Sequence, residues 1–104
     1  MLAPIITNNL NEIKALCEQY KVKELYVFGS AVSDNFNAGS DVDLIVKFNN
    51  DVPVEDYADL YFDLADGLEG LFKRKVDLMT DKPIENKYLK LKIDASKQMI
   101  YAAA

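Results

Sequence analysis

The chain has 104 residues, half of them apolar, which is enough for one folded domain with one hydrophobic core. Its formal net charge of −5 argues against strong nucleic-acid binding, which needs many Lys or Arg side chains at phosphates. The lack of histidine removes the commonest general base and the usual zinc ligand, and a single cysteine excludes an internal disulfide. Neither a signal peptide nor an apolar run of membrane-spanning length is evident, so we expect a cytoplasmic protein without a membrane anchor.

Helix and strand patterns follow one another in the first half of the chain. Apolar residues at helical spacing predict a helix near residues 7–20, capped by Thr7 or Asn8. The β-branched and aromatic run 25–28 predicts a buried strand. Residues 30–32 are expected to form a short helix, and a loop rich in Asn, Gly and Ser then leads to a second strand at 42–48.

The second half predicts two more helices and one strand. Residues 54–72 predict a long helix with an apolar stripe. Residues 73–75 are interpreted as a solvated turn before a third strand at 76–79, and residues 81–83 as another turn. A final helix is expected over 86–101, with Leu89, Ile93 and Ile100 on its buried face. The long helix also carries an acidic stripe, interpreted as a solvated face: Asp56, Asp59, Asp63 and Asp66.

The order of predicted elements is helix, strand, strand, helix, strand, helix. This order predicts an α/β (α+β) fold, in which a small mixed sheet of about three to four strands is backed by helices. We expect a single domain over residues 1–101, because no repeat or linker interrupts the pattern. The three alanines at 102–104 are expected to form a tail outside this domain.

Two carboxylates stand at the start of the predicted second strand. Residues i and i+2 of a strand share a face, so Asp41 and Asp43 should project together. Two carboxylates this close repel one another, and Mg²⁺ would compensate them because it takes oxygen ligands and keeps positions open for phosphates. Asp77 could reach the same cleft if the third strand neighbours the second, and three carboxylates can hold two metal ions. The alternative for Asp77 is an edge-strand acid that faces water.

A glycine–serine pair follows the first predicted strand. Gly29 would let the backbone approach a ligand closely, because it has no Cβ. If Ser30 opens a helix, the free N–H groups there and its hydroxyl would point at an anion. The pair therefore predicts a phosphate-binding turn, although the Walker pattern with its Gly-Lys-Ser/Thr is absent.

These features occur at a characteristic spacing: Gly29-Ser30, ten further residues, Asp41-x-Asp43, and an aspartate at position 77. The pattern resembles the DNA polymerase beta-like nucleotidyltransferase superfamily, and is most similar to its minimal nucleotidyltransferases (MNT). The resemblance implies a nucleotidyltransferase fold and Mg²⁺-dependent transfer of a nucleoside monophosphate, AMP from ATP in the first place, to an acceptor hydroxyl. It also implies a HEPN-domain protein as partner, since members of this branch resemble antitoxins that can adenylylate a tyrosine of a HEPN toxin.

The enzyme hypothesis assigns a role to each of these residues. Asp41 and Asp43 would bind two Mg²⁺ ions, Asp77 would bind the catalytic ion and serve as a candidate general base, and Gly29 and Ser30 would bind the β- and γ-phosphates of the nucleotide. One departure from the family is that many relatives carry an arginine just after Gly-Ser, whereas Ala31-Val32-Ser33 stands there in this chain.

Two alternatives to this hypothesis remain. The protein could be a catalytically weak or inactive module of MNT fold that neutralises a HEPN partner by direct contact. It could instead be an enzyme whose acceptor is a small molecule, although a chain of 104 residues leaves little room for a second substrate domain.

Overall fold

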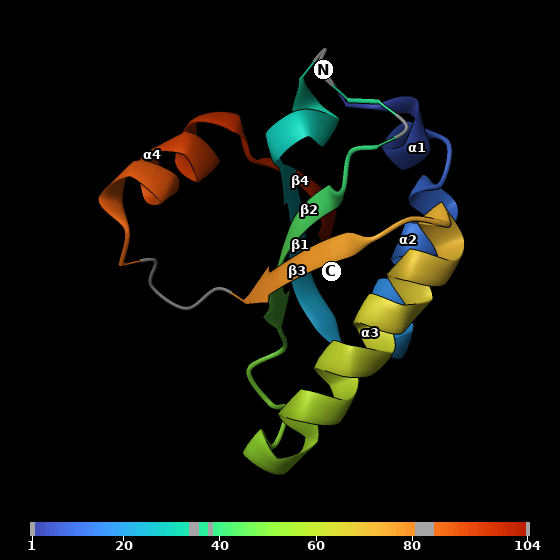
Figure 1. Cartoon of the computed structure of the whole chain (residues 1–104). Coiled ribbons are helices and arrows are strands. Elements are labelled where there is room, and N and C mark those ends of the chain that lie inside the picture. The colour runs from blue at the N-terminus through green and yellow to red at the C-terminus, as the bar shows by residue number, and fades with distance from the viewer. Residues whose placement is uncertain (1, 34–35, 38, 81–84, 104) are drawn as a thin grey trace.

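The computed structural model describes residues 2–33, 36–37, 39–80 and 85–103. A four-stranded mixed sheet forms its centre, in the order β3-β2-β1-β4 (Figure 1). β1 (Val22–Phe28) is antiparallel to both β2 (Val42–Phe48) and β4 (Gln98–Ala102), whereas β2 is parallel to β3 (Val76–Thr80). The predicted fold class, a small mixed sheet backed by helices, is therefore confirmed. The turn predicted at 81–83 lies outside the described residues.

The helices lie on both sides of this sheet. They are α1 (Pro4–Thr7), α2 (Leu10–Gln19), α3 (Tyr57–Phe72) and α4 (Lys87–Ser96), with short 3-10 helices η1 (Gly29–Val32) and η2 (Val54–Asp56). α2 and α3 pack side by side on one face, and α4 lies on the other (Figure 1). The acidic stripe of α3 is exposed, as predicted.

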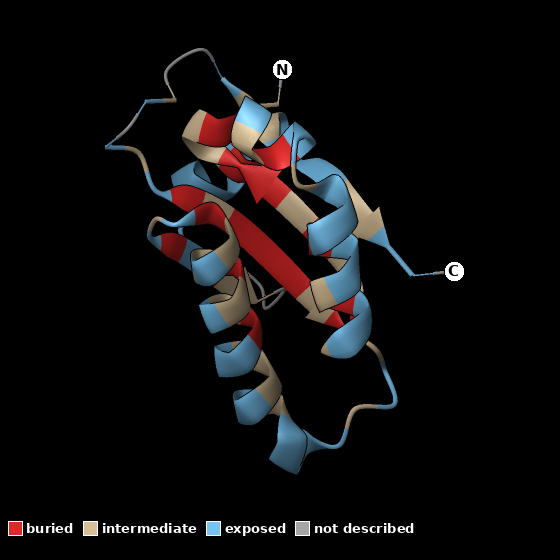
Figure 2. Cartoon of the chain, turned by 90° about the vertical axis from the view of Figure 1, so that its right-hand side faces the viewer, coloured by how far each residue is buried: buried red, intermediate tan, exposed pale blue. Residues whose placement is uncertain are grey.

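The main hydrophobic core lies between the sheet and the helices α2 and α3, and Figure 2 shows buried residues, in red, on both the strands and the helices. Alternate residues of β2 and β3 point into it, which is the period that a strand with one buried face requires. Burial raises the pKa of the Cys17 thiol to about 12, with the Glu18 charge as a smaller contribution, so this thiol stays protonated at neutral pH. The fully buried members of this core include Ile13, Cys17, Leu25, Val27, Val42, Leu44, Val46, Leu64 and Leu68.

A second and much smaller apolar cluster lies on the opposite face of the sheet. It joins Ile93 of α4 to Phe28 of β1 and Ile45 of β2, and Tyr26 and Met79 pack around it. Ile93 is buried as predicted, and it is the only residue of α4 with a buried side chain among those described. This cluster attaches α4 to the sheet.

Two boundaries in the first half differ from prediction. The helix expected over 7–20 is interrupted, because α1 ends at Thr7 and α2 begins at Leu10. Between them the Asn9 side chain donates to the Ile5 carbonyl oxygen at 2.7 Å, and neither predicted cap forms at the start of α2. β1 begins at residue 22, three residues earlier than expected, because pairing with β2 and β4 extends the strand over polar residues.

The predicted final helix is wrong in its second half. α4 ends at Ser96, and Lys97 adopts an extended conformation with ψ 138°. The next five residues form β4 and pair with β1, so Ile100 lies in a strand rather than on a helix, while Leu89 remains 40% exposed. Two of the alanines expected to form a tail also take part, since Ala102 pairs with Glu24 and the Ala103 N–H donates to the Lys23 carbonyl oxygen at 2.8 Å.

Among the described residues, no helix combines the length and the apolar character needed to cross a membrane.

Candidate active site

The residues singled out by the sequence meet where β1 ends and β2 begins. Phe28, the last residue of β1, lies opposite Asp43 of β2. Val42 and Leu44 point into the main core, so Asp43 between them projects from the other face of the sheet. This face also carries the small cluster that holds α4. The candidate site therefore lies beside α4, away from the main core.

Asp77 is the direct neighbour of Asp43 on the adjacent strand. β2 and β3 run parallel, and their register pairs Val42 with Val76 and Asp43 with Asp77. Paired residues of neighbouring strands share a face, so the two carboxylates project on the same side of the sheet. Asp43 is half-buried and Asp77 is exposed. The condition on which Asp77 was predicted to join the site, adjacency of the second and third strands, is met.

The electrostatics of Asp43 reflect these neighbours. Burial raises the pKa of the Asp43 carboxyl, and the negative charges of Asp77 and then Asp41 raise it further. Asp41 itself is exposed and immediately precedes β2. Each of these causes disfavours the ionised form of the Asp43 carboxyl, and a bound cation would favour that form. The charges of Asp77 and Asp41 thus both act on the Asp43 carboxylate.

These carboxylates are not arranged as a complete metal centre. Within the part of the chain that the structure describes, no group of three or more acidic, cysteine or histidine side chains stands ready to hold a metal ion. The structure brings Asp43 and Asp77 to paired positions, while Asp41 contributes its charge from the strand start. Carboxylate oxygens are the donors that Mg²⁺ prefers, so the pair fits such an ion chemically, with water and phosphate oxygens as further ligands.

Gly29 is required at its position by two independent features. Its φ of +72° lies in the left-handed region, which residues with a side chain rarely adopt. A Cβ built on it would lie 2.5 Å from Oδ2 of Asp43, inside van der Waals contact. Gly29 therefore lets the Asp43 carboxylate lie against the backbone at the start of η1. The half-buried Ser30 follows within this short helix, which was predicted from Ser30 onward.

Arg74 is a residue whose position the sequence analysis missed. It was interpreted as part of a solvated turn, which describes the exposed Lys73 and Lys75 but not Arg74. The Arg74 guanidinium donates hydrogen bonds to carbonyl oxygens of the loop before Asp41 and stacks on an aromatic ring there. Its partners lie 34 and 37 residues earlier, so no local pattern could have indicated these contacts. Its being the sole arginine of the chain was the one available signal.

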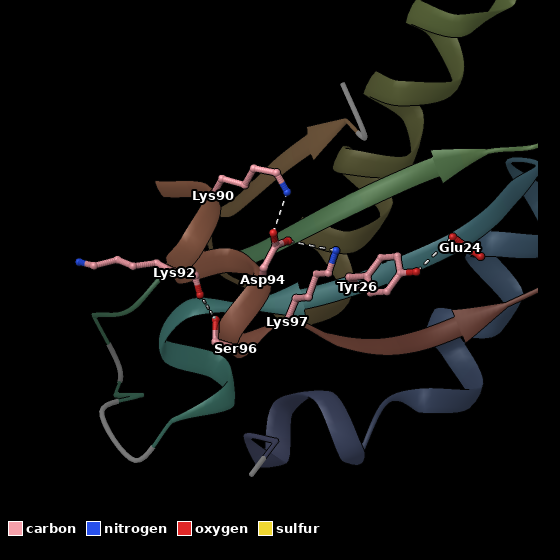
Figure 3. Close-up of polar contacts among 7 residues, drawn as sticks. All are labelled: Glu24, Tyr26, Lys90, Lys92, Asp94, Ser96 and Lys97. Atoms are coloured by element: carbon pink, nitrogen blue, oxygen red, sulfur yellow. Dashed lines mark hydrogen bonds and ion pairs between the residues drawn. The ribbon is translucent and has the colours of Figure 1, made fainter. Parts of the chain in front are cut away.

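Lys90 of α4 and Lys97, which follows the helix, form a network with Asp94 (Figure 3). Lys90 Nζ lies 2.7 Å from Asp94 Oδ2, and Lys97 Nζ lies 3.4 Å from Asp94 Oδ1. Lys97 Nζ also lies 5.2 Å from the ring centroid of Tyr26, whose hydroxyl donates to Glu24 Oε1 at 3.1 Å. The hydrogen bond from Lys90, and then that from Lys97, lowers the pKa of the Asp94 carboxyl.

Both the sequence and the fold of this chain are similar to those of known proteins. The family described as nucleotidyltransferase domain matches residues 12–102. Two candidate protein adenylyltransferases of Methanocaldococcus jannaschii, MJ0128 and MJ1379, are both 38% identical to this chain. The matches extend over 81 residues for MJ0128 and 82 for MJ1379, and each covers 78% of this chain and 79% of the relative.

Solved structures share the fold at lower identity. A candidate minimal nucleotidyltransferase has a TM-score of 0.65 at 23% identity, with 94% of this chain and 95% of that one covered. An MNT antitoxin in complex with the tri-AMPylated HEPN toxin of Shewanella oneidensis is also similar, with a TM-score of 0.61 at 20% identity and coverage of 94% and 73%. A toxin–antitoxin complex with AMP-PNP has a TM-score of 0.67 at 21% identity, with coverage of 91% and 74%. The sequence match over most of its length shows that this chain belongs to the nucleotidyltransferase domain family.

Proposed function

We propose that the protein is an Mg²⁺-dependent nucleotidyltransferase that transfers AMP from ATP to a hydroxyl group, in the first instance a tyrosine of a HEPN-domain toxin, and so acts as an antitoxin. The observation that carries this proposal is the pairing of Asp43 with Asp77 on parallel strands beside Gly29. The archaeal relatives support AMP as the transferred group and a protein as the acceptor. The similarity to an MNT antitoxin supports the choice of partner.

The acidic residues would hold the metal ions. Asp43 and Asp77 would contribute oxygens from their paired positions, and Asp41 would add a further ligand from the strand start, enough for one ion and, with phosphate oxygens, for two. Bound Mg²⁺ would make the attacking hydroxyl more acidic and would offset the charge on the departing pyrophosphate.

The remaining residues would position the substrate and move the proton. Gly29 would allow phosphate oxygens close to the backbone, and Ser30 would supply a hydroxyl donor. The acceptor oxygen would form a bond to the α-phosphorus while the bond to pyrophosphate breaks. Since the chain has no histidine, a carboxylate would accept the proton of the hydroxyl, and the exposed Asp77 is the candidate.

The test follows the transferred group. With α-labelled ATP, Mg²⁺ and the HEPN partner, we expect the wild type to label a partner tyrosine and Asp43→Asn to lose at least about 100-fold of this activity, since outer-shell changes alone cost up to that much. Asp63→Asn, which removes an exposed acid on α3, should label like the wild type. Equal labelling by wild type and Asp43→Asn would contradict the proposal.

A second candidate function is binding without efficient catalysis. It is favoured by the lack of an arginine after Gly29-Ser30 and by the engagement of Arg74 with the loop before Asp41, which leaves the chain no other guanidinium for phosphates. In this case the protein would neutralise its partner by contact alone. A rise in melting temperature with MgATP that disappears in Asp43→Asn would support the enzyme. Partner binding without any such rise would support the binding module.

A further inference from the structure

The connection between α3 and β3 is held firmly at both ends. Lys73 ends the helix in a left-handed conformation, φ 55°, and its N–H donates to the Glu69 carbonyl oxygen at 2.8 Å. The Glu69 carboxylate accepts a hydrogen bond from the Val76 N–H at 3.2 Å, where β3 begins. Arg74 therefore projects from a short segment whose backbone is fixed by one glutamate.

From this segment the Arg74 side chain reaches the loop that precedes Asp41. Nη1 donates to the carbonyl oxygens of Asn37 and Ser40, both at 3.0 Å, and Cζ lies 4.5 Å from the ring centroid of Phe36. Arg74 is half-buried in this position. A guanidinium can satisfy two carbonyl groups and stack on a ring at the same time, which the ammonium of lysine cannot do with equal geometry.

The loop that Arg74 contacts is a closed turn. The Ser40 N–H donates to the Asn37 carbonyl oxygen at 3.0 Å, and the Asn37 N–H donates to Ser40 Oγ at 3.1 Å. The Gly39 N–H donates to Asn37 Oδ1 at 2.9 Å. Because these bonds link Asn37 to Ser40, a contact that fixes the carbonyl groups of both residues also fixes the direction of the chain toward Asp41.

The two peptide groups that flank Asp41 are both tied to the same connection. The Ser40 carbonyl, bound by Arg74, belongs to the peptide before Asp41. The Val42 N–H belongs to the peptide after Asp41, and it donates to the Lys75 carbonyl oxygen at 3.1 Å. Residues 74 and 75 stand three and two positions before Asp77, respectively. The backbone of Asp41 is thereby held relative to the strand that carries Asp77.

We propose that Arg74 is a positioning residue of the candidate site, which places the Asp41 carboxylate for a metal ion shared with Asp43 and Asp77. This inference rests on the proposed function and deepens it. Arg74 acts through the backbone of Ser40 and does not contact the nucleotide. Its loss should therefore lower the affinity for Mg²⁺ in the presence of nucleotide more than it lowers the stability of the fold.

The experiment compares three variants in the full chain: Arg74→Ala, Arg74→Lys and the control Lys73→Gln. Lys73→Gln also removes one positive charge from the connection, from an exposed side chain. Calorimetric titration of ATP at a series of Mg²⁺ concentrations gives the apparent Kd for Mg²⁺. We expect Arg74→Ala to raise this Kd by about 10- to 100-fold, Arg74→Lys to give an intermediate value, and Lys73→Gln to match the wild type.

Hydrogen exchange of the free protein supplies a readout that needs no ligand. In Arg74→Ala the amides of Ser40 and Val42, which are both hydrogen-bonded in this structure, should exchange faster, while those of β1 should not change. An Arg74→Ala protein with the Mg²⁺ affinity of Lys73→Gln would overturn the inference. Should Arg74→Ala fail to fold, an Arg74→Lys protein indistinguishable from wild type in both measurements would overturn it equally. A wild type that binds no MgATP would refute the proposed function itself, and this inference with it.

Discussion

The two faces of the sheet differ in what covers them. The face toward α2 and α3 is closed by a continuous apolar core, whereas the face toward α4 has one small apolar cluster and the acidic pair (Figures 1 and 2). Neighbouring residues of β2 point to opposite faces, since Leu44 is fully buried in the core and Asp43 projects from the other side. The comparison indicates that one face stabilises the domain and leaves the other free to carry charge.

The acidic pair and Gly29 on the α4 face destabilise the fold, and the main core must offset this loss of stability. Asp43 and Asp77 place two negative charges on paired positions, and like charges opposite one another destabilise a sheet. Gly29 holds a left-handed conformation against the Asp43 carboxylate. A protein selected for stability alone would keep neither feature, so both point to a function at this edge of the sheet.

The largest effect is expected when a core residue is truncated. Leu44→Ala should lower the free energy of unfolding by about 3–5 kcal/mol, because it opens a cavity among fully buried side chains. Ile45→Ala, the adjacent residue on the α4 face, should cost only about 2 kcal/mol, because the small cluster can relax toward solvent. Urea unfolding of both variants checks this difference. Equal losses, or a greater loss for Ile45→Ala, would mean that the α4 face contributes as much stability as the main core.

A smaller effect, with a sharper control, concerns Gly29. Gly29→Ala should destabilise the protein by about 1–2 kcal/mol because of its positive φ, and the added Cβ should displace the Asp43 carboxylate. Gly70→Ala on α3 meets no atom within 4 Å of its Cβ and should stabilise by up to about 1 kcal/mol. Thermal melts give both values. A Gly29→Ala protein as stable as Gly70→Ala would show that Gly29 does not hold this left-handed conformation against the Asp43 carboxylate.

The smallest effect is a gain of stability in Asp43→Asn that depends on pH. Because the pKa of Asp43 is raised in the folded state, the native protein binds more protons than the unfolded chain between about pH 4 and that raised value. The wild type should therefore lose stability relative to Asp43→Asn as pH rises through this window, to a plateau of at most about 1 kcal/mol, the size of a cross-strand pair.

Urea titrations of both proteins between pH 4 and pH 8 measure this difference. Added Mg²⁺ should reduce it at pH 7, because a cation favours the ionised carboxylate. A difference that is constant over the whole pH range, or that favours the wild type at neutral pH, would contradict the placement of Asp43 beside Asp77.

Much of the fold was predictable because local pattern and tertiary structure agree. The strand at 42–48 and the end of the long helix at Phe72 match the prediction, since alternation and helical spacing reflect the faces that become buried. The final strand was not predictable in this way. Residues 98–102 have no strong local preference, and pairing with β1, more than seventy residues earlier, decides their conformation.

In the candidate site, too, some residues are indicated by local sequence pattern and others depend on tertiary structure. Asp41, Asp43 and Gly29 could be proposed from the sequence because strand period and glycine chemistry are local properties. The pairing of Asp77 with Asp43 depends on strand order, which the sequence left conditional. The contacts of Arg74 depend on how two distant loops meet, so only coordinates could show them.

The central claim is that Asp43 and Asp77 together bind the metal ion that accompanies the nucleotide. Crystals grown with Mn²⁺ and a non-hydrolysable ATP analogue would test it through the anomalous scattering of the metal. We expect a peak within about 2.1–2.2 Å of an oxygen of each carboxylate, with the phosphates of the analogue on the same ion beside Gly29. A metal bound to the phosphates alone, or an analogue bound elsewhere on the protein, would contradict the account.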